Sequence, residues 1–193
     1  MTIYQDVQRK AREEIDRVIG SGRLPTLADK GDLPYCASLV KEVLRWGVVG
    51  PLGVPHVAKV DDVYNGHHIA KGTIIVANIW GMLHDELRYP APFDFNPDRF
   101  ADGTQPDPAQ FVFGFGRRAC PGSHMAQSTI FLSVTQTLAL FEIQRVRNEQ
   151  GEEITPPAEF ATGMISHPTP FQCKITPRED RLHLFQDTLS MGV

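Results

Sequence analysis

The sequence contains few of the residues and runs that would assign it to several large classes of protein. Its 193 residues include 3 cysteines, which stand far apart at positions 36, 120 and 173. Cysteines so scattered form neither the close pairs of a structural zinc site nor a disulfide framework, which favours a reducing compartment. The most apolar run, 74–83, contains Asn78 and is shorter than the ~20 residues that span a bilayer.

The chain also carries little net charge and has no basic stripe. Its formal charge is −4, with 22% charged residues, which argues against nucleic acid as a partner. A hydrophobic content of 41% is typical of a folded globular chain, and the length suits one domain or a large part of one. The first six residues are polar and unlike a signal peptide, so we expect a cytosolic chain without a membrane anchor of its own.

Residues 111–122 concentrate the side chains that could do chemistry. They read Phe-Val-Phe-Gly-Phe-Gly-Arg-Arg-Ala-Cys-Pro-Gly and lead into a long apolar-periodic segment. Glycines let the backbone turn sharply and approach a bulky group, while Pro121 suits the first turn of a helix. Cys120 would then lie at a helix N-terminus beside two arginines, where a thiolate is favoured.

A nucleophilic thiolate needs a base held by a third group, and no such set is readable here. One thiolate among aromatics, with an arginine two residues before it, better suits a single axial bond to a large flat metallocofactor with acidic edges. Two other interpretations stay open. The stretch Gly114–Ala119 also fits the weak dinucleotide pattern G-x-G-x-x-A, and a lone cysteine beside a turn can be a buried structural residue.

The same stretch resembles the haem-binding loop of the cytochrome P450 family, Phe-x-x-Gly-x-Arg-x-Cys-x-Gly. Phe113, Gly116, Arg118, Cys120 and Gly122 fill its positions. The resemblance implies that Cys120 is the catalytic centre's metal ligand, the proximal thiolate of haem b (iron protoporphyrin IX). It also implies that Arg118 pairs with a haem propionate, and that Phe113 and the glycines pack under the ring.

Two further motifs strengthen the resemblance. Glu42 and Arg45 stand three apart on a predicted helix and share a face, as in the family's Glu-x-x-Arg pair. Pro97–Phe100 matches the family's Pro-x-Arg-Phe element, so Arg99 would complete a network with that pair and hold the haem loop in place. His56 stands where the family often has a second propionate partner; a surface histidine at a strand start is the alternative.

The fold class expected is α+β, mainly α, as the C-terminal portion of the cytochrome P450 fold with small antiparallel sheets. Apolar spacing predicts helices over 4–20 and 34–47, the first with a solvated charged face, and a largely buried helix after Cys120. Asn65-Gly66 predicts a hairpin turn between Val57–Val60 and His67–Ile69. Residues 160–168 and 170–176 suggest a terminal hairpin, and 182–189 a weak last helix.

The resemblance implies a monooxygenase that oxidises a small organic substrate with O2 and with electrons from an NADPH-dependent reductase, which would dock near Arg117. Substrate contacts would come from the segment over the haem and from the terminal hairpin tip, namely Val49, Leu52, Met164 and Ile165. The sequence of residues 78–85 resembles that of filamentous-fungal family members that tailor secondary metabolites. A haem-thiolate isomerase or dehydratase, and a non-catalytic remnant or binding module, are the alternatives.

Family chains are well over twice this length, and members of this type are anchored in the endoplasmic-reticulum membrane, facing the cytosol. We therefore expect residues 1–193 to form a partial domain, the proximal haem-thiolate half, without the N-terminal region or the distal helix that delivers protons to bound oxygen. Such a chain alone should bind haem poorly and should not turn over.

Overall fold

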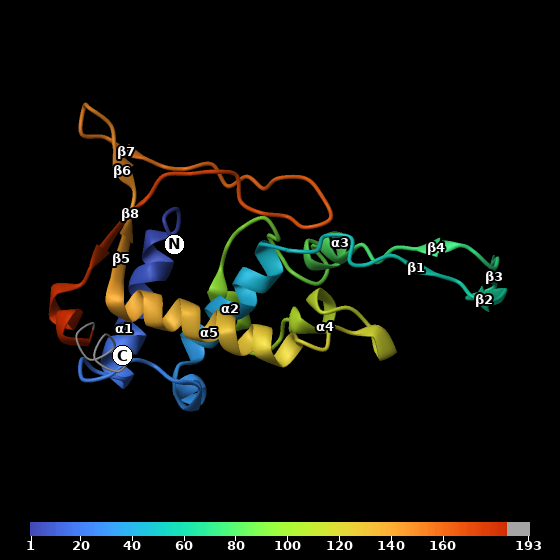
Figure 1. Ribbon diagram of the computed structural model, residues 1–193, viewed down its shortest axis with the longest axis horizontal. Coiled ribbons are helices and arrows are strands. Elements are labelled where there is room, and N and C mark those ends of the chain that lie inside the picture. Colours follow the sequence, from blue (N-terminus) through green and yellow to red (C-terminus); the bar gives the residue numbers. More distant parts are fainter. Residues whose placement is uncertain (185–193) are drawn as a thin grey trace, which may run out of the picture.

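Three helices form the body of the protein. The structure is a computed structural model that describes residues 1–184. The three are α1 (Gln5–Val18), α2 (Pro34–Trp46) and α5 (Ser123–Leu140), which lie against one another (Figure 1). Shorter elements surround them: α3 (Ile79–Leu83), α4 (Ala109–Val112), and the 3-10 turns η1 (Leu27–Asp32), η2 (Pro97–Phe100), η3 (Gly116–Arg118) and η4 (Glu179–Arg181).

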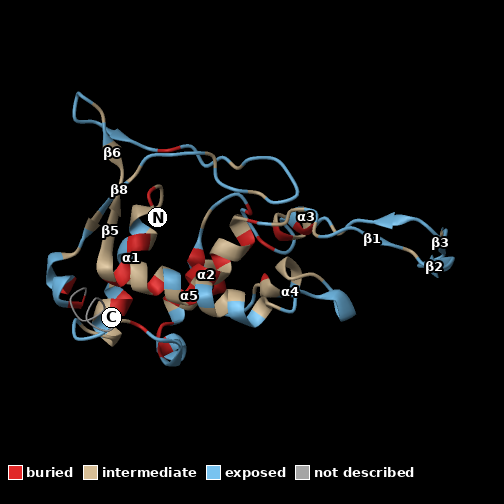
Figure 2. Ribbon diagram, in the orientation of Figure 1, coloured by how far each residue is buried: buried red, intermediate tan, exposed pale blue. Residues whose placement is uncertain are grey.

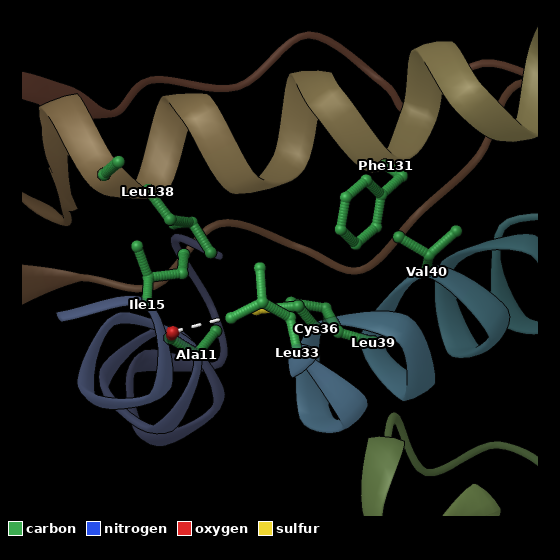
Figure 3. Close-up of a cluster of buried hydrophobic side chains, with 9 residues drawn as sticks. Ala11, Ile15, Leu33, Cys36, Leu39, Val40, Phe131 and Leu138 are labelled. Atoms are coloured by element: carbon green, nitrogen blue, oxygen red, sulfur yellow. Dashed lines mark hydrogen bonds between the residues drawn. The ribbon is translucent and has the colours of Figure 1, made fainter. Parts of the chain in front are cut away.

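The main hydrophobic core lies where these three helices meet. Apolar residues recur along each helix at a spacing that places them on one face. Figure 3 shows Ala11 and Ile15 of α1 and Cys36 of α2 pointing toward Phe131 and Leu138 of α5. Each of these five side chains is fully or almost fully buried. The predicted burial of the third helix holds for its C-terminal half, whereas Met125 near its start is exposed.

The predicted solvated face of the first helix is only partly right, because Gln8 and Glu14 are buried. The Glu14 carboxylate accepts hydrogen bonds from the backbone amides of Tyr35 (2.9 Å) and Cys36 (2.8 Å). These amides belong to the first turn of α2, where N–H groups have no partner within the helix. A charged residue of α1 therefore caps α2, which fixes the angle between the two helices.

The strands within residues 1–184 form four separate two-stranded antiparallel sheets. The first two are β1 (His56–Val57) with β4 (Ile74–Ile75), and β2 (Asp62–Tyr64) with β3 (His67–Ile69). Asn65 (φ 51°) and Gly66 (φ 81°) form the turn between β2 and β3, as predicted. The strand predicted before it is wrong: a two-residue turn pairs Tyr64 with His67, so 62–64 rather than 57–60 faces β3. This hairpin projects from the helical body and is exposed along most of its length (Figures 1 and 2).

The predicted terminal hairpin is also wrong in its pairing. β8 (Lys174–Pro177) pairs with β5 (Phe141–Gln144), a strand that follows α5 without a connecting loop, and β6 (Val146–Arg147) pairs with β7 (Glu153–Ile154). Residues 160–168 instead close on themselves through the bridge between Phe160 and Pro168. No turn residue separates β5 from the end of α5. The sequence pattern therefore gave no signal for the start of this strand.

Most of the weak helix predicted over 182–189 lies outside the described residues. Within residues 1–184, none of the helices combines the length and the apolar character needed to cross a lipid bilayer.

Candidate functional site

The Cys120 thiol is presented at the surface by a tight loop. The Cys120 amide donates to the Phe113 carbonyl (2.7 Å), which closes the loop across residues 113–120. Gly114 (φ 75°) and Gly116 (φ 58°) adopt a backbone conformation that side chains with a Cβ rarely take. An added Cβ at Gly116 would meet no atom within 4 Å, so this part of the loop is open. Cys120 is exposed.

The helix after the cysteine begins later than Pro121 suggests. α5 starts at Ser123 with Gly122 as its N-cap residue, so Pro121 precedes the helix and the prediction of Pro121 in its first turn is wrong. The Ser123 amide donates to the Cys120 carbonyl at 3.3 Å, which ties the cysteine to the start of α5. Cys120 thus directly precedes a helix N-terminus, where the partial positive charge of the helix favours an anion.

Three cationic or titratable groups that the motifs single out are exposed. Arg117 and Arg118 lie on η3 within the cysteine loop, and His56 lies in β1 opposite Ile75. Across residues 1–184, the side chains of all three lack a hydrogen-bond or ion-pair partner. Unpaired guanidinium groups beside an exposed thiol are available to the acidic edge of a bound group.

Glu42, Arg45 and Arg99 meet in one buried network. The Arg45 guanidinium binds the Glu42 carboxylate through two hydrogen bonds of 2.7 and 2.9 Å. Arg99 donates to the same carboxylate at 3.2 Å, and the Asn96 amide does so at 2.7 Å. The Glu42 and Arg45 side chains have no exposed surface. Isolated buried charges are costly, so this set persists because each group has several partners.

Backbone carbonyls complete the network. Arg45 donates to the carbonyl oxygens of Leu83 (3.0 Å) and Pro92 (2.7 Å), and Arg99 donates to that of Pro90 (2.8 Å). Both arginines also donate to the Asp94 carbonyl. The network therefore fixes α2, the end of α3 and the proline-rich segment 90–99 relative to one another.

Tyr89, which the sequence patterns did not single out, extends this network toward the cysteine loop. The Arg45 guanidinium lies 5.6 Å from the centre of the Tyr89 ring, which is fully buried. The Tyr89 hydroxyl donates to the Pro106 carbonyl at 3.0 Å. Residues 106–112 then lead directly into the loop, and Lys41 of α2 pairs with Asp107 at 3.3 Å. The only sequence signal for Tyr89 is its place before Pro90.

The other two cysteines have different surroundings. Cys36 is fully buried in the core, and burial together with the negative charge of Glu14 raises the pKa of its thiol. Cys173 is half-buried beside β8. Across residues 1–184 there is no group of three or more His, Cys, Asp or Glu side chains that could hold a metal ion. A metal at Cys120 would therefore have this one protein thiolate and would need its other ligands from a cofactor.

The residues predicted to contact substrate are exposed, and the structure brings the two segments that carry them together. Val49, Leu52, Met164 and Ile165 are all exposed. The Ser166 amide donates to the Val49 carbonyl at 2.8 Å, so the 164–166 tip lies against the segment that follows α2.

An apolar cavity of about 560 Å³ lies below the 156–171 segment. Trp46, Val49, Phe160 and Ser166 line it, with Ser133 and Thr137 from the C-terminal half of α5. Cys120 is not among its lining residues, because it stands before the other end of α5. The cavity and the cysteine loop are thus two separate features of the same helix.

Comparison with known proteins gives a consistent result. The sequence profile of the family described as Cytochrome P450 matches residues 1–175. Among curated proteins, cytochrome P450 monooxygenase claR of Ampulloclitocybe clavipes is 49% identical over 92% of this chain and 34% of its own length. Cytochrome P450 monooxygenase 208 of Postia placenta is 50% identical, over 92% and 35% respectively. This chain thus spans about a third of the length of these relatives.

A solved structure agrees. A zebra fish cytochrome P450, described with abiraterone, superposes with a TM-score of 0.82 and 31% sequence identity. The match covers 92% of this chain and 41% of the zebra fish chain. The small antiparallel sheets around a mainly helical body are therefore those of a known fold.

Proposed function

The chain belongs to the cytochrome P450 family, and from this premise we propose that residues 1–193 form the haem-thiolate part of a monooxygenase. The observation that carries the proposal is the exposed Cys120 thiol just before α5, in a glycine loop that Tyr89 links to a buried ion network. A thiolate that binds a cofactor metal needs an accessible sulfur and a well-supported loop, and this part of the chain would supply both. We propose haem b as the cofactor.

The residues present fit such a group. Cys120 would supply the sulfur that binds the metal, and the open backbone at Gly116 would leave room for a flat ring to approach. Arg118 and His56, exposed and without side-chain partners among residues 1–184, would bind the two carboxylates of the cofactor. Phe113 would pack under the ring and keep water from the sulfur. When bound through a thiolate, haem activates O2 for transfer of one oxygen atom to an organic substrate.

The residues of the buried ion network and Tyr89 affect Cys120 indirectly, by holding the loop that carries it. The Glu42–Arg45–Arg99 network fixes the segment 90–99, and Tyr89 joins it to residues 106–112, which enter the loop. A ligand atom must be held within fractions of an ångström to keep its bond geometry. We therefore assign the three charged residues to positioning the cysteine loop rather than to the reaction itself.

The proposed substrate is a small organic molecule in contact with Val49, Leu52, Met164 and Ile165. All four are apolar and exposed, and the hydrogen bond from the Ser166 amide to the Val49 carbonyl places two of their segments together. The relatives claR and 208 are named as monooxygenases, which supports the same reaction class here. The electrons would come from an NADPH-dependent reductase.

The assignment of Cys120 is tested in the full-length haem-loaded protein. Cys120→Ser replaces the thiolate with a poor ligand, so the Soret band of the ferrous–CO complex should lose its thiolate-specific position. Cys173→Ser is the matched control, since Cys173 is half-buried and distant in sequence from the loop, and it should keep the band. A Cys120→Ser protein with the wild-type band would refute the assignment.

The reductase partner is tested by Arg117→Glu. Arg117 is exposed on the cysteine side of the loop, so reversing its charge should slow reduction by the reductase while leaving haem content unchanged. Stopped-flow reduction under CO measures the rate, and Lys59→Glu, on the projecting hairpin, is the charge-matched control. Equal loss of haem and of reduction in Arg117→Glu would count against docking at this face.

A further inference from the structure

Residues 159–169 form a closed loop with its own internal hydrogen bonds. Phe160 and Pro168 face each other in a β-bridge, and the Ala161 amide donates to the His167 carbonyl at 2.7 Å. The Thr169 amide donates to the Glu159 carbonyl at 3.0 Å. We call this segment the 159–169 loop; its tip holds Met164 and Ile165, which are 71% and 57% exposed. The tip residues are therefore too exposed for their own packing to hold them in place.

The loop meets the end of α2 at two points. The Phe160 ring packs edge-on against Trp46, with 5.2 Å between ring centres and an angle of 68°. At the other side of the loop, the Ser166 amide donates to the Val49 carbonyl. These two contacts hold the loop above the apolar cavity that Trp46 and Phe160 both line.

Trp46 is itself held firmly. Its indole N–H donates to the Phe93 carbonyl at 3.0 Å, and its ring packs edge-on against Phe95 (5.6 Å) and Tyr4 (5.9 Å). It directly follows Arg45, the centre of the buried ion network. The loop is thus attached through Phe160 to the end of α2 that adjoins the buried ion network.

We propose that Trp46 and Phe160 are positioning residues that determine how large an organic ligand the proposed haem site admits. They do so by fixing the tip of the 159–169 loop relative to Val49. Two rings packed edge-on hold a fixed mutual orientation, so the ring of Phe160 transmits the position of α2 to the loop. The proposal rests on the proposed function, since the tip limits ligand size only if it faces the haem.

Nitrogen ligands of two sizes test the proposal in the full-length haem-loaded protein. The neutral imidazole nitrogen binds haem iron directly, so the Soret shift reports binding without turnover. Imidazole is a single small ring, whereas 4-phenylimidazole carries a second, apolar ring that the tip would contact. Phe160→Ala removes the aromatic pair that holds the tip, so the size limit should relax. We expect 4-phenylimidazole to bind roughly 3- to 10-fold more tightly and imidazole to change less than twofold.

Two further variants make the result specific. Phe160→Tyr keeps the ring and should restore wild-type selectivity, while Phe171→Ala removes an exposed phenylalanine that lines the same cavity outside the loop, and should change neither affinity. An unchanged ratio of the two affinities in Phe160→Ala, or an equal change in Phe171→Ala, would overturn the proposal.

A second measurement separates this proposal from the proposed function. If Cys120→Ser keeps the wild-type band of the ferrous–CO complex, the haem assignment fails and the size-selection proposal falls with it. Hydrogen exchange at the Ser166 amide then still tests the positioning contact. It should become faster in Phe160→Ala and not in Phe171→Ala. Unchanged exchange in Phe160→Ala would refute a positioning role for the ring whatever the state of the haem site.

Discussion

Glu42 is a carboxylate without exposed surface that accepts hydrogen bonds from two guanidinium groups and one backbone amide. Glu42→Gln keeps the shape of the side chain and removes its charge, which leaves the cations of Arg45 and Arg99 buried without a counterion. Removal of one partner from a buried ion pair costs about 3–5 kcal/mol. Urea unfolding should show a loss of that size in the free energy of unfolding.

Glu149→Gln is the matched control for that experiment. Glu149 is exposed in a surface turn, so its substitution should change the free energy of unfolding by no more than about 0.5 kcal/mol. Equal stabilities for the two variants would show that the network contributes no more than ordinary surface charges do.

Tyr89 should make the free energy of unfolding depend on pH in the alkaline range. Burial raises the pKa of Tyr89 from 10.0 to about 12. The neutral form is therefore favoured in the folded state, and its stabilising contribution is complete below pH 10 and is lost as the pH rises toward 12. Tyr89→Phe should lessen the decline of the free energy of unfolding between pH 10 and 12. Burial also raises the pKa of Tyr35, so part of the decline should persist; an unchanged decline would contradict the role of Tyr89.

At the scale of single residues, the sequence predicts which side chains join the ion network better than it predicts the backbone groups that they bind. Glu42 and Arg45 share a helix face at i, i+3, so their pairing could be read from spacing. The carbonyl groups of Leu83 and Pro92 could not, because every residue has a carbonyl and only the path of the chain decides which one faces Arg45. The roles of Cys120 and Arg118 toward haem stay predictions.

At the scale of elements, one carboxylate of α1 caps the first turn of α2. Glu14 accepts hydrogen bonds from two amides of the first turn of α2, and it is buried. Glu14→Ala leaves those amides without an acceptor and should destabilise the protein by about 1–3 kcal/mol. Glu13→Ala, next to it on α1, removes an exposed ion pair with Arg9 and should cost about 0.5 kcal/mol at most. Thermal unfolding compares the two; a smaller loss for Glu14→Ala than for Glu13→Ala would contradict the capping role.

Turns and helix caps were predictable where the local sequence favoured one backbone conformation. The turn at Asn65 and Gly66 was predictable because both residues favour positive φ. Asn is a favoured N-cap residue, and the Asn78 side chain at the start of α3 accepts a hydrogen bond from the Gly81 amide. Strand partners were not predictable, because the 29 residues 145–173 separate β5 from β8 and nothing in either strand's sequence specifies the other as its partner.

At the scale of the whole molecule, the two ends of the described chain are joined at α1. The segment between β5 and β8 runs along the top of the view in Figure 1. β8 and η4 then lie beside α1. Sequence gives no sign of this closure, because Asp16, Arg178 and Arg181 read as ordinary surface charges. In the structure Arg181 is buried and binds both the Asp16 carboxylate and the Gly20 carbonyl.

This closure can be tested at Asp16. Arg178 donates to both carboxylate oxygens of Asp16, at 2.7 and 3.0 Å, and Arg181 donates to one of them. Asp16→Asn removes the charge that both arginines share, so segment 174–184 should separate from α1 more often. Amide exchange in β5 and β8, and proteolytic cleavage within 174–184, should become several-fold faster. Asp6→Asn changes a 92% exposed carboxylate on the same helix and should leave both rates as they are. If the two variants behave alike, the strand pairing of β5 with β8, rather than the ion cluster, holds the end of the chain in place.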